Sequence, residues 1–335
     1  MIKDKIVVVG AGSWGTALAL VLANKGCFDV TMWEYNKELA EKMERERENE
    51  KLLPGAKFPD NLHVTNDDTD LLKDAKAVVF SIPSQVLRGV VARFSNQMRS
   101  DLLIVNTGKG IEISSGLRLS EVIKDEILGK YHNNIVVLSG PTHAEEVCKG
   151  IPTTIVAAGK LDKAKAVQEI FNSEVFRVYV NEDMIGVELG AAVKNCLALG
   201  AGISDGLGFG DNTKAALITR GVAEMIRFGE KCGANPKTFY GLSGIGDLIV
   251  TCASKHSRNR YVGEKLGRGE TLKEILEGMT MVAEGVPTVK AVYTKAQELN
   301  VSMPIVEAVY KVLYEDEKAA VMVRELMSRD LKEEF

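Results

Sequence analysis

The sequence has few of the residues that build disulfide frameworks and metal centres. Its 335 residues include only five cysteines, which form no CxxC pair. An odd, dispersed set of this kind is typical of reduced thiols in a cytosolic protein. The four histidines lie far apart, with no HExxH or similar spacing. The sequence therefore predicts neither disulfides nor a bound metal.

Long hydrophobic runs and an excess of positive charge are also missing. The apolar run at residues 6–9 ends at Gly10 and is too short for a signal peptide. No stretch approaches the ~18 consecutive apolar residues of a membrane span, so we expect a cytoplasmic protein. The net charge of -4 argues against nucleic acid as a partner. It does not exclude a small anion, which needs only a few local cations and backbone amides.

The pattern of the first half predicts an α/β fold. Segments 16–24 and 37–51 are helical in pattern, and the second carries mixed charges typical of a solvated helix. Short apolar runs rich in β-branched residues alternate with such segments at residues 6–9, 30–33, 77–82, 102–105 and 135–138. Runs of this type suit strands buried on both faces of an open parallel sheet.

The pattern changes after about residue 182, where strand-like runs disappear. Long helical patterns follow at residues 184–203, 212–229 and 304–314. A single core rarely grows beyond ~250–300 residues, so two domains are expected. We predict an α/β Rossmann-type domain over residues 1–183 and an all-α substrate-binding and catalytic domain over residues 184–335. An active site between two domains is the natural expectation.

A glycine motif stands directly after the first predicted strand. Gly10, Gly12 and Gly15 form a GxGxxG element that is followed at once by a helical pattern. Gly10 permits the tight turn, Gly12 lets the backbone approach a pyrophosphate, and Gly15 lets helix and strand pack closely. The helix N-terminus offers amide groups to phosphates. In this context the motif predicts dinucleotide binding rather than a simple glycine-rich turn.

Glu34 ends the second predicted strand, 19 residues after Gly15. An acidic residue there accepts hydrogen bonds from ribose hydroxyls and repels a 2′-phosphate, which favours NAD over NADP. Two other interpretations stay open. Glu34 could simply begin the charged helix that follows, or the register could place Tyr35 or Asn36 at the ribose.

Two polar clusters follow later strands of the predicted sheet. Lys109 comes shortly after residues 102–105, where open α/β sheets bind ligands, and we expect it to face the crevice. Thr142 follows residues 135–138, and Glu145 stands three residues beyond it, as in a capping box. Helix capping and phosphate binding are compatible interpretations of that segment. A histidine between these two residues is an acid or base, or is purely structural.

The second half contains a lysine in an otherwise apolar helical stretch, Lys194. Burial would lower its pKa from ~10.4, and such a lysine can exchange a proton with a substrate oxygen. Asp247 and Thr251 are four residues apart and would share one face of a helix. Arg258 and Asn259 offer a fork and an amide suited to phosphate oxygens. For Lys194 the alternative is a structural lysine whose stem lies along a helix face. For Arg258 and Asn259 the alternative is an ordinary basic surface.

Taken together, these motifs resemble the NAD(P)-dependent glycerol-3-phosphate dehydrogenases. The matching segments occur in that family's order and span residues 6 to about 263, with further similarity near residues 282–285 and 303–305. They read GAGSWGTALA, KGIE, SGPTHAEEV, GAAVKN, RGVAEM, GDLIVTC and SRNR. Where many members carry a basic residue near position 34, this chain has Glu34.

The resemblance implies roles by position. Lys194 matches the catalytic lysine that gives a proton in ketone reduction and takes one in alcohol oxidation. Lys109 matches a second lysine that touches both substrate and nicotinamide. Asp247 and Thr251 match residues that orient Lys194 and the substrate hydroxyls. The implied substrate contacts, with Arg258 as the main phosphate ligand, are Lys109, Gly140, Thr142, Lys194, Asp247, Ser257, Arg258 and Asn259. The expected cofactor contacts are Gly10, Gly12, Ser13, Trp14, Gly15, Glu34, Lys109, Ala144, Arg258, Val282 and Glu284.

The implied reaction is the interconversion of dihydroxyacetone phosphate and sn-glycerol 3-phosphate, which supplies phospholipid synthesis. NAD is the expected cofactor, NADP an alternative, and a homodimer is compatible with the sequence. One competing hypothesis is a two-domain dehydrogenase of another hydroxy acid or of a sugar nucleotide, for which Cys252 would be the nucleophile. A non-enzymatic NAD sensor is another, but it would leave Lys109, Lys194 and Asp247 unexplained.

Overall fold

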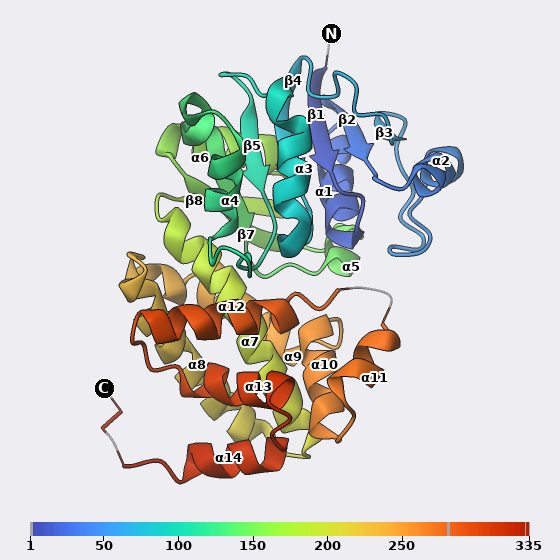
Figure 1. The fold of residues 1–335 in the computed structure, drawn as a ribbon. Coiled ribbons are helices and arrows are strands. Elements are labelled where there is room, and N and C mark those ends of the chain that lie inside the picture. Colours follow the sequence, from blue (N-terminus) through green and yellow to red (C-terminus); the bar gives the residue numbers. More distant parts are fainter. Residues whose placement is uncertain (1–2, 280–281, 332, 335) are drawn as a thin grey trace. The chain divides into compact units, whose positions relative to one another are not determined.

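The computed structural model describes residues 3–279, 282–331 and 333–334. The chain divides into two compact units (Figure 1). The first comprises Met1–Lys109 and Leu117–Glu188, and the second comprises Gly110–Gly116 and Leu189–Phe335. Helix α7 (Met184–Gly206) thus contributes its first turn to the first unit. The single boundary between residues 183 and 184 stays a prediction, because the second unit also takes in a short segment from the first half.

The first unit is built on one eight-stranded sheet with the order β3-β2-β1-β4-β5-β6-β7-β8. All neighbouring strands are parallel except β6 and β7, which are antiparallel. The strands are β1 (Asp4–Val9), β2 (Phe28–Trp33), β3 (Leu62–Thr65), β4 (Ala75–Phe80), β5 (Leu103–Asn106), β6 (Ile135–Ser139), β7 (Thr153–Gly159) and β8 (Phe176–Asn181). The predicted α/β class and the five predicted strands are confirmed, with small shifts at their ends.

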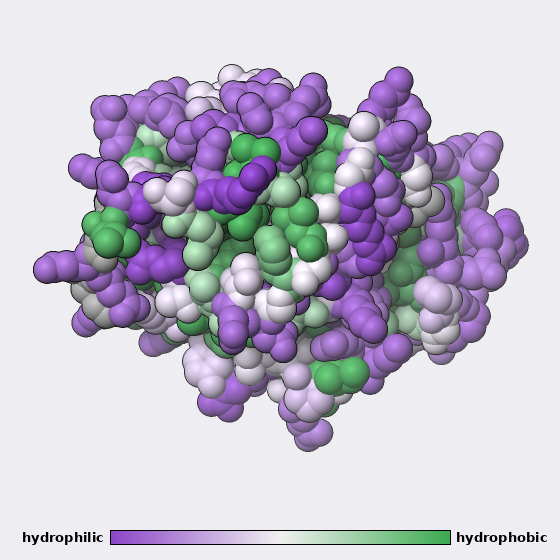
Figure 2. Space-filling model, turned by 90° about the horizontal axis from the view of Figure 1, so that it is seen from below, coloured by the Kyte–Doolittle hydropathy of each residue, from purple (hydrophilic) through white to green (hydrophobic). Residues whose placement is uncertain are grey.

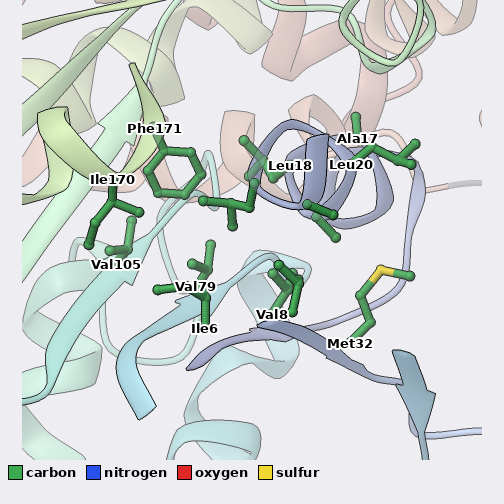
Figure 3. Close-up of a cluster of buried hydrophobic side chains, with 14 of the residues drawn as sticks. Ile6, Val8, Ala17, Leu18, Leu20, Met32, Val79, Val105, Ile170 and Phe171 are labelled. Atoms are coloured by element: carbon green, nitrogen blue, oxygen red, sulfur yellow. The ribbon is translucent and has the colours of Figure 1, made fainter. Parts of the chain in front are cut away.

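Helices cover both faces of this sheet, so strand β1 is buried on both sides. Ile6 and Val8 point into a core shared with α1 and α6, where Figure 3 shows Leu18 and Phe171. Val7 and Val9 point into the opposite core, which α3 and α4 cover. A strand buried on both faces reads as a continuous apolar run. The helices are α1 (Ser13–Asn24), α2 (Lys37–Glu46), α3 (Leu87–Phe94), α4 (Leu119–Glu126), α5 (Ala144–Val147) and α6 (Leu161–Phe171).

Helix α2 is shorter than the predicted helix over residues 37–51. It ends at Glu46 because Arg47 adopts a left-handed conformation, with φ of 53°. Asn36 caps its start by accepting a hydrogen bond from the Leu39 N–H at 2.9 Å. The residues after Arg47 form a loop that runs towards β3, and one of them, Asn49, is buried. The charge pattern continued past the helix and gave no signal for this stop.

The described part of the second unit is helical, as predicted. Its helices are α7, α8 (Asp211–Lys231), α9 (Asp247–Ala253), α10 (Arg258–Gly267), α11 (Leu272–Glu277), α12 (Gly285–Glu298), α13 (Pro304–Tyr314) and α14 (Ala319–Met327). Figure 2 views the side on which α14 lies, where hydrophobic residues gather near the middle of a largely hydrophilic face. Met327 at the end of α14 is 82% exposed.

Within the second unit, α7 is the central helix. Among the described residues it is the one helix that is long and apolar enough, by length and composition, to cross a membrane. The criterion of consecutive apolar residues did not select it, since Glu188 and Lys194 interrupt the run. Of its apolar window, 89% is buried inside the protein, as in the core helix of a globular unit, so it is weak evidence of a span.

Helices α7 and α10 cross at very short range because both are lined by glycine. A Cβ atom added at Gly202 or Gly206 would overlap with backbone atoms of α10. A Cβ atom added at Gly263 or Gly267 would overlap with backbone atoms of α7. The crossing fixes the start of α10, which carries Arg258, relative to the helix that carries Lys194.

Candidate functional site

The glycine motif forms a tight loop between β1 and α1. Gly10 has a φ of 105°, and its N–H donates to the Trp33 carbonyl oxygen at 2.9 Å. A Cβ at Gly10 would lie 2.5 Å from the Ser81 carbonyl oxygen, and one at Gly15 would overlap with the Gly10 carbonyl. A Cβ at Gly12 would meet nothing within 4 Å. The loop is therefore closed against the protein at Gly10 and Gly15, while its backbone is accessible at Gly12.

The N-terminus of α1 has the features of a phosphate-binding site. Its N-cap residue, Gly12, provides no side-chain capping bond to the first amide groups of the helix. Ser13 and Trp14 form the first turn, and the indole Nε1 of Trp14 is buried without a hydrogen-bond acceptor among the described residues. Uncapped N–H groups and the helix dipole together attract a phosphate. These features fit a dinucleotide lying on an accessible backbone at Gly12.

Glu34 follows the last residue of β2, as the sequence indicated. Its N–H donates to the Thr65 carbonyl oxygen, and its carboxylate accepts from the Asn36 N–H at 3.0 Å. It thus both ends the strand and braces the start of α2. Tyr35, the alternative ribose neighbour, is 74% exposed. The half-buried carboxylate of Glu34 lies at the carboxyl end of the strand next to β1, where a ribose is expected.

Lys109 and Thr142 converge on one carbonyl group. The Nζ atom of Lys109 donates to the Gly140 carbonyl oxygen at 3.0 Å, and the Thr142 hydroxyl donates to the same oxygen at 3.2 Å. The two loops follow β5 and β6, which are parallel neighbours, so their carboxyl ends share one edge of the sheet. Gly140 is itself constrained, since a Cβ there would lie 3.0 Å from the Ile155 Cα atom.

The predicted capping box at Thr142 is wrong. Helix α5 is a single turn, its N-cap residue is His143, and no side chain caps it. The Thr142 hydroxyl instead donates to the carbonyl oxygen of Gly140, two residues earlier in the chain. Ala144, an expected cofactor contact, is the first residue of α5 and is buried.

In the second unit, three buried polar side chains meet. Lys194 on α7 lies with its Nζ atom 3.0 Å from Oδ1 of Asp247 and 2.8 Å from Oγ1 of Thr251. The Thr251 hydroxyl donates to the Asp247 carbonyl oxygen at 2.6 Å, so its lone pairs are available to Lys194. All three residues are at most 5% exposed. We call these three side chains the Lys194 cluster.

Local backbone structure brings Asp247 to Lys194. A π-helical turn, η5 (Leu242–Gly246), leads directly into α9, whose first residue is Asp247. Helix α7 approaches this turn at Gly190, where a Cβ would lie 2.6 Å from the Ser243 carbonyl oxygen. Turns of this kind often occur at functional sites. Asp247 and Thr251 lie one turn apart on α9, as their spacing predicted.

Asn259 is held by a chain of amide hydrogen bonds. Its Nδ2 atom donates to Oδ1 of Asn195 at 2.9 Å, and its own Oδ1 accepts from the Gly285 N–H at 2.9 Å. Our sequence reasoning gave Asn195 no role, and its position next to Lys194 was the only available signal. These hydrogen bonds connect α7, α10 and α12 immediately beside the Lys194 cluster.

The remaining predicted residues of this unit lie around the start of α10. Ser257 is the N-cap of α10 and accepts from the Arg260 N–H at 3.1 Å. Arg258 is exposed, and one of its guanidinium N–H groups donates to the Val282 carbonyl oxygen at 3.0 Å. Glu284 is the N-cap residue of α12. Val282 and Glu284 thus lie in the segment that leads into α12, with Arg258 in contact with its beginning.

Cys252 is unsuited to nucleophilic catalysis. It is fully buried, and burial raises the pKa of its thiol to about 12. The reactive form of cysteine is the thiolate, so Cys252 stays unreactive near neutral pH. The described residues also contain no group of three or more histidine, cysteine, aspartate or glutamate side chains placed to hold a metal.

A dinucleotide-binding α/β unit joined to a helical unit with a buried lysine–aspartate pair defines a class, the two-domain nicotinamide-dependent oxidoreductases. The sequence profile of the NAD-dependent glycerol-3-phosphate dehydrogenase N-terminus matches residues 5–165. The profile of the C-terminus of the same family matches residues 183–324. The chain therefore belongs to the NAD-dependent glycerol-3-phosphate dehydrogenase family.

Individual relatives agree along the whole chain. A Chlorobium phaeobacteroides (strain DSM 266) protein named glycerol-3-phosphate dehydrogenase [NAD(P)+] is 51% identical over 98% of this chain and 99% of its own. One of the same name from Bacillus licheniformis is 49% identical over 97% of this chain and 94% of its own. The crystal structure of glycerol-3-phosphate dehydrogenase from Coxiella burnetii has a TM-score of 0.92 at 37% identity, covering 98% and 99% of the two chains.

More distant structures share the fold alone. A ketopantoate reductase from Ralstonia eutropha has a TM-score of 0.61 at 13% identity, covering 96% of this chain and 99% of its own. The fold therefore does not by itself identify a substrate. The substrate of this chain has to be argued from its residues and its family.

Proposed function

We propose that this enzyme interconverts dihydroxyacetone phosphate and sn-glycerol 3-phosphate, with Lys194 as proton donor and acceptor. The observation that carries the mechanism is the contact of Lys194 with Asp247 and Thr251. A buried ammonium group held by two fixed oxygen acceptors is oriented before the substrate binds. The membership of the chain in its family supports the choice of substrate.

The residues around Lys194 divide the work of proton transfer. In ketone reduction the ammonium donates a hydrogen bond to the C2 carbonyl oxygen and then gives up the proton. The carboxylate of Asp247 stabilises the ammonium before transfer, and the Thr251 oxygen fixes its direction. In alcohol oxidation the neutral amine takes the proton from the C2 hydroxyl. Lys109, from the first unit, is proposed to stabilise the negative charge that develops on the same oxygen.

The phosphate of the substrate is assigned to the start of α10. Arg258 offers an exposed guanidinium fork there, while Ser257 and Asn259 flank it. An anion is also favoured by the amide groups at a helix N-terminus. Gly140 and Thr142 complete the proposed substrate contacts from the first unit. Holding the phosphate orients the carbonyl carbon for reaction.

The cofactor site fits NAD. Bound nicotinamide supplies the hydride for ketone reduction and accepts it in the reverse direction. Gly10, Gly12 and Gly15 with Ser13 and Trp14 would hold the pyrophosphate, and Glu34 would accept hydrogen bonds from the adenosine ribose. The negative charge of Glu34 opposes a 2′-phosphate, so NAD is the proposed preference over NADP. Further cofactor contacts are assigned to Lys109, Ala144, Arg258, Val282 and Glu284.

The remaining assignments extend the same proposal. Residues 1–183 would form the dinucleotide-binding domain and residues 184–335 the substrate-binding and catalytic domain. A cytoplasmic location and a supply of glycerol 3-phosphate for phospholipid synthesis fit this activity. The homodimer stays a prediction, which sedimentation velocity would test directly.

Initial rates with several ketones test the substrate assignment. We expect rapid NADH consumption with dihydroxyacetone phosphate and a much lower kcat/KM with dihydroxyacetone, which lacks the phosphate. Arg258→Ala should raise the KM for dihydroxyacetone phosphate and remove most of the difference between the two ketones. Equal rates with both ketones in the wild-type enzyme would contradict the phosphate assignment. NADH binding without turnover of any ketone would favour the sensor hypothesis instead.

A further inference from the structure

The loop after α2 reaches back to the glycine motif through one buried side chain. The Nδ2 atom of Asn49 donates to the Ala11 carbonyl oxygen at 2.9 Å and to the Thr16 hydroxyl oxygen at 2.9 Å. The Thr16 hydroxyl in turn donates to the Ala11 carbonyl oxygen at 3.3 Å. Asn49 is 1% exposed and Thr16 is fully buried. The Asn49 amide therefore donates to Ala11, which lies between the first two glycines, and to Thr16, which directly follows the third.

These bonds determine which way the peptide group between Ala11 and Gly12 faces. No peptide bond among the described residues is cis, and in a planar trans peptide the C=O and N–H groups point in opposite directions. With the Ala11 carbonyl held inward by Asn49 and Thr16, the Gly12 N–H points outward. That is the exposed side, where a Cβ at Gly12 would meet nothing within 4 Å. The fixed carbonyl thus aims a backbone donor towards the space left for a phosphate.

Asn49 is itself held in place by its own backbone. Its carbonyl oxygen accepts from the Leu52 and Leu53 N–H groups, at 3.2 and 2.8 Å. The flanking residue Glu48 forms an isolated antiparallel bridge with Lys57. The loop is thus a braced structure that presents one amide to the glycine motif, rather than a flexible connection. A side chain without N–H donors at position 49 would leave the Ala11 carbonyl buried with the Thr16 hydroxyl alone.

We propose that Asn49 is a positioning residue for dinucleotide binding, acting through the Ala11 carbonyl to preorganise the Gly12 amide for the cofactor pyrophosphate. This inference rests on the cofactor site of the proposed function and adds a residue to it. Asn49 touches no substrate and takes no part in proton transfer. Its loss should therefore weaken cofactor binding while leaving the chemical step, measured at saturating NADH, nearly unchanged.

A second asparagine in the same unit provides a matched control. The Nδ2 atom of Asn61 also donates to two backbone carbonyl oxygens, those of Ala23 and Phe28, both at 2.9 Å. These carbonyls lie at the end of α1 and the start of β2, away from the glycine motif. Replacing Asn61 removes the same kind of bonds from the same unit. It should lower thermal stability without changing NADH affinity.

The experiment compares Asn49→Ala and Asn49→Asp with Asn61→Ala and Asn61→Asp. The two Asp variants keep the side-chain shape, so they serve as the test if the Ala variants fail to fold. NADH dissociation constants come from fluorescence titration, and KM values for NADH and dihydroxyacetone phosphate come from initial rates. Loss of a buried hydrogen bond predicts an increase in the NADH dissociation constant on the order of tenfold for the Asn49 variants. Their kcat and their KM for the ketone should change by less than about twofold.

Each result decides the question. NADH affinity within about twofold of wild type in folded Asn49→Asp would overturn the proposal. An equal loss of affinity in the Asn49 and Asn61 variants would also overturn it, because the effect would then be one of general stability. Failure of the wild-type enzyme to bind NADH would instead refute the proposed function itself.

Discussion

The Nζ atom of Lys194 lies 3.0 Å from Oδ1 of Asp247, and their side chains are only 7% and 1% exposed. An ion pair this deeply buried costs desolvation energy that its attraction only partly repays. A buried ion pair is therefore weak evidence for stability. Here the carboxylate holds the Nζ atom of the proposed proton donor in place.

Asp247→Asn should reduce both stability and turnover. It leaves the buried ammonium of Lys194 without its partner, a change that costs about 3–5 kcal/mol. The double variant Lys194→Met, Asp247→Asn removes both charges and should recover part of this stability while staying inactive. Urea unfolding and initial rates measure the two effects. Asp205→Asn is the control, since Asp205 on the same helix α7 pairs with Lys214 of α8 and Arg260 of α10 instead of Lys194. Normal turnover of Asp247→Asn would contradict the role assigned to the pair.

Glu34→Gln should shift the cofactor preference. The carboxylate would repel a 2′-phosphate, and the amide keeps an oxygen acceptor for the Asn36 N–H. We expect the ratio of kcat/KM for NADPH to that for NADH to rise about tenfold, equivalent to about 1.4 kcal/mol. Parallel assays with the two cofactors measure this ratio. An unchanged ratio would show that Glu34 only braces the start of α2.

Glu224 should make stability depend on pH. It is buried beneath the start of α13, where its carboxylate accepts from the Ile305 and Val306 N–H groups. Burial raises its pKa to about 7 against the opposing effect of these two donors. Between about pH 4.5 and 7 the folded protein therefore keeps a proton that the unfolded chain has released. Its contribution to stability falls as pH rises through this window and is constant above it.

Glu224→Gln removes that contribution. The free energy of unfolding, measured by urea titration at several pH values, should lose the part of its pH dependence that lies between about pH 4.5 and 7. The amide oxygen can still accept from the start of α13, so the fold should be kept. A pH dependence identical to that of the wild type would contradict the raised pKa.

Two glycine substitutions should have opposite effects on stability. A Cβ at Gly263 would overlap with the Leu199 carbonyl oxygen at the crossing of α7 and α10. Gly263→Ala should therefore destabilise the protein by about 1–3 kcal/mol. Gly89 is exposed within α3, and a Cβ there would meet nothing within 4 Å. Gly89→Ala should stabilise by about 0.5–1 kcal/mol. Thermal unfolding of both variants checks the two signs, and two losses of similar size would contradict the account of the crossing.

The sequence predicted the parts of the fold that carry a strong local pattern. The five continuous apolar runs became strands because both faces of the sheet are covered. Strand β8 was missed since Arg177 and Tyr179 point outward and break the run. Strand β3 was missed because it has only four residues, with His63 exposed among them. The stop of α2 at Arg47 depends on a backbone conformation that the charge pattern does not reveal.

The candidate site was predictable where one segment contains the chemistry. The glycine motif and the spacing of Asp247 and Thr251 were readable because their partners are close in sequence. The bonds from Asn49 to Ala11 and from Asn259 to Asn195 join residues 38 and 64 positions apart. Such contacts exist only in the folded chain. The capping box at Thr142 failed for the opposite reason, since a local pattern was present but the N-cap is His143, one residue later.

The most direct test of the account is the rate of NADH consumption by Lys194→Ala with saturating dihydroxyacetone phosphate. If Lys194 is the proton donor, the variant should fold and bind NADH like the wild type while kcat falls by roughly a factor of 100 to 10,000. A folded variant that binds NADH and keeps a wild-type kcat would contradict the assignment of Lys194 and, with it, the proposed mechanism.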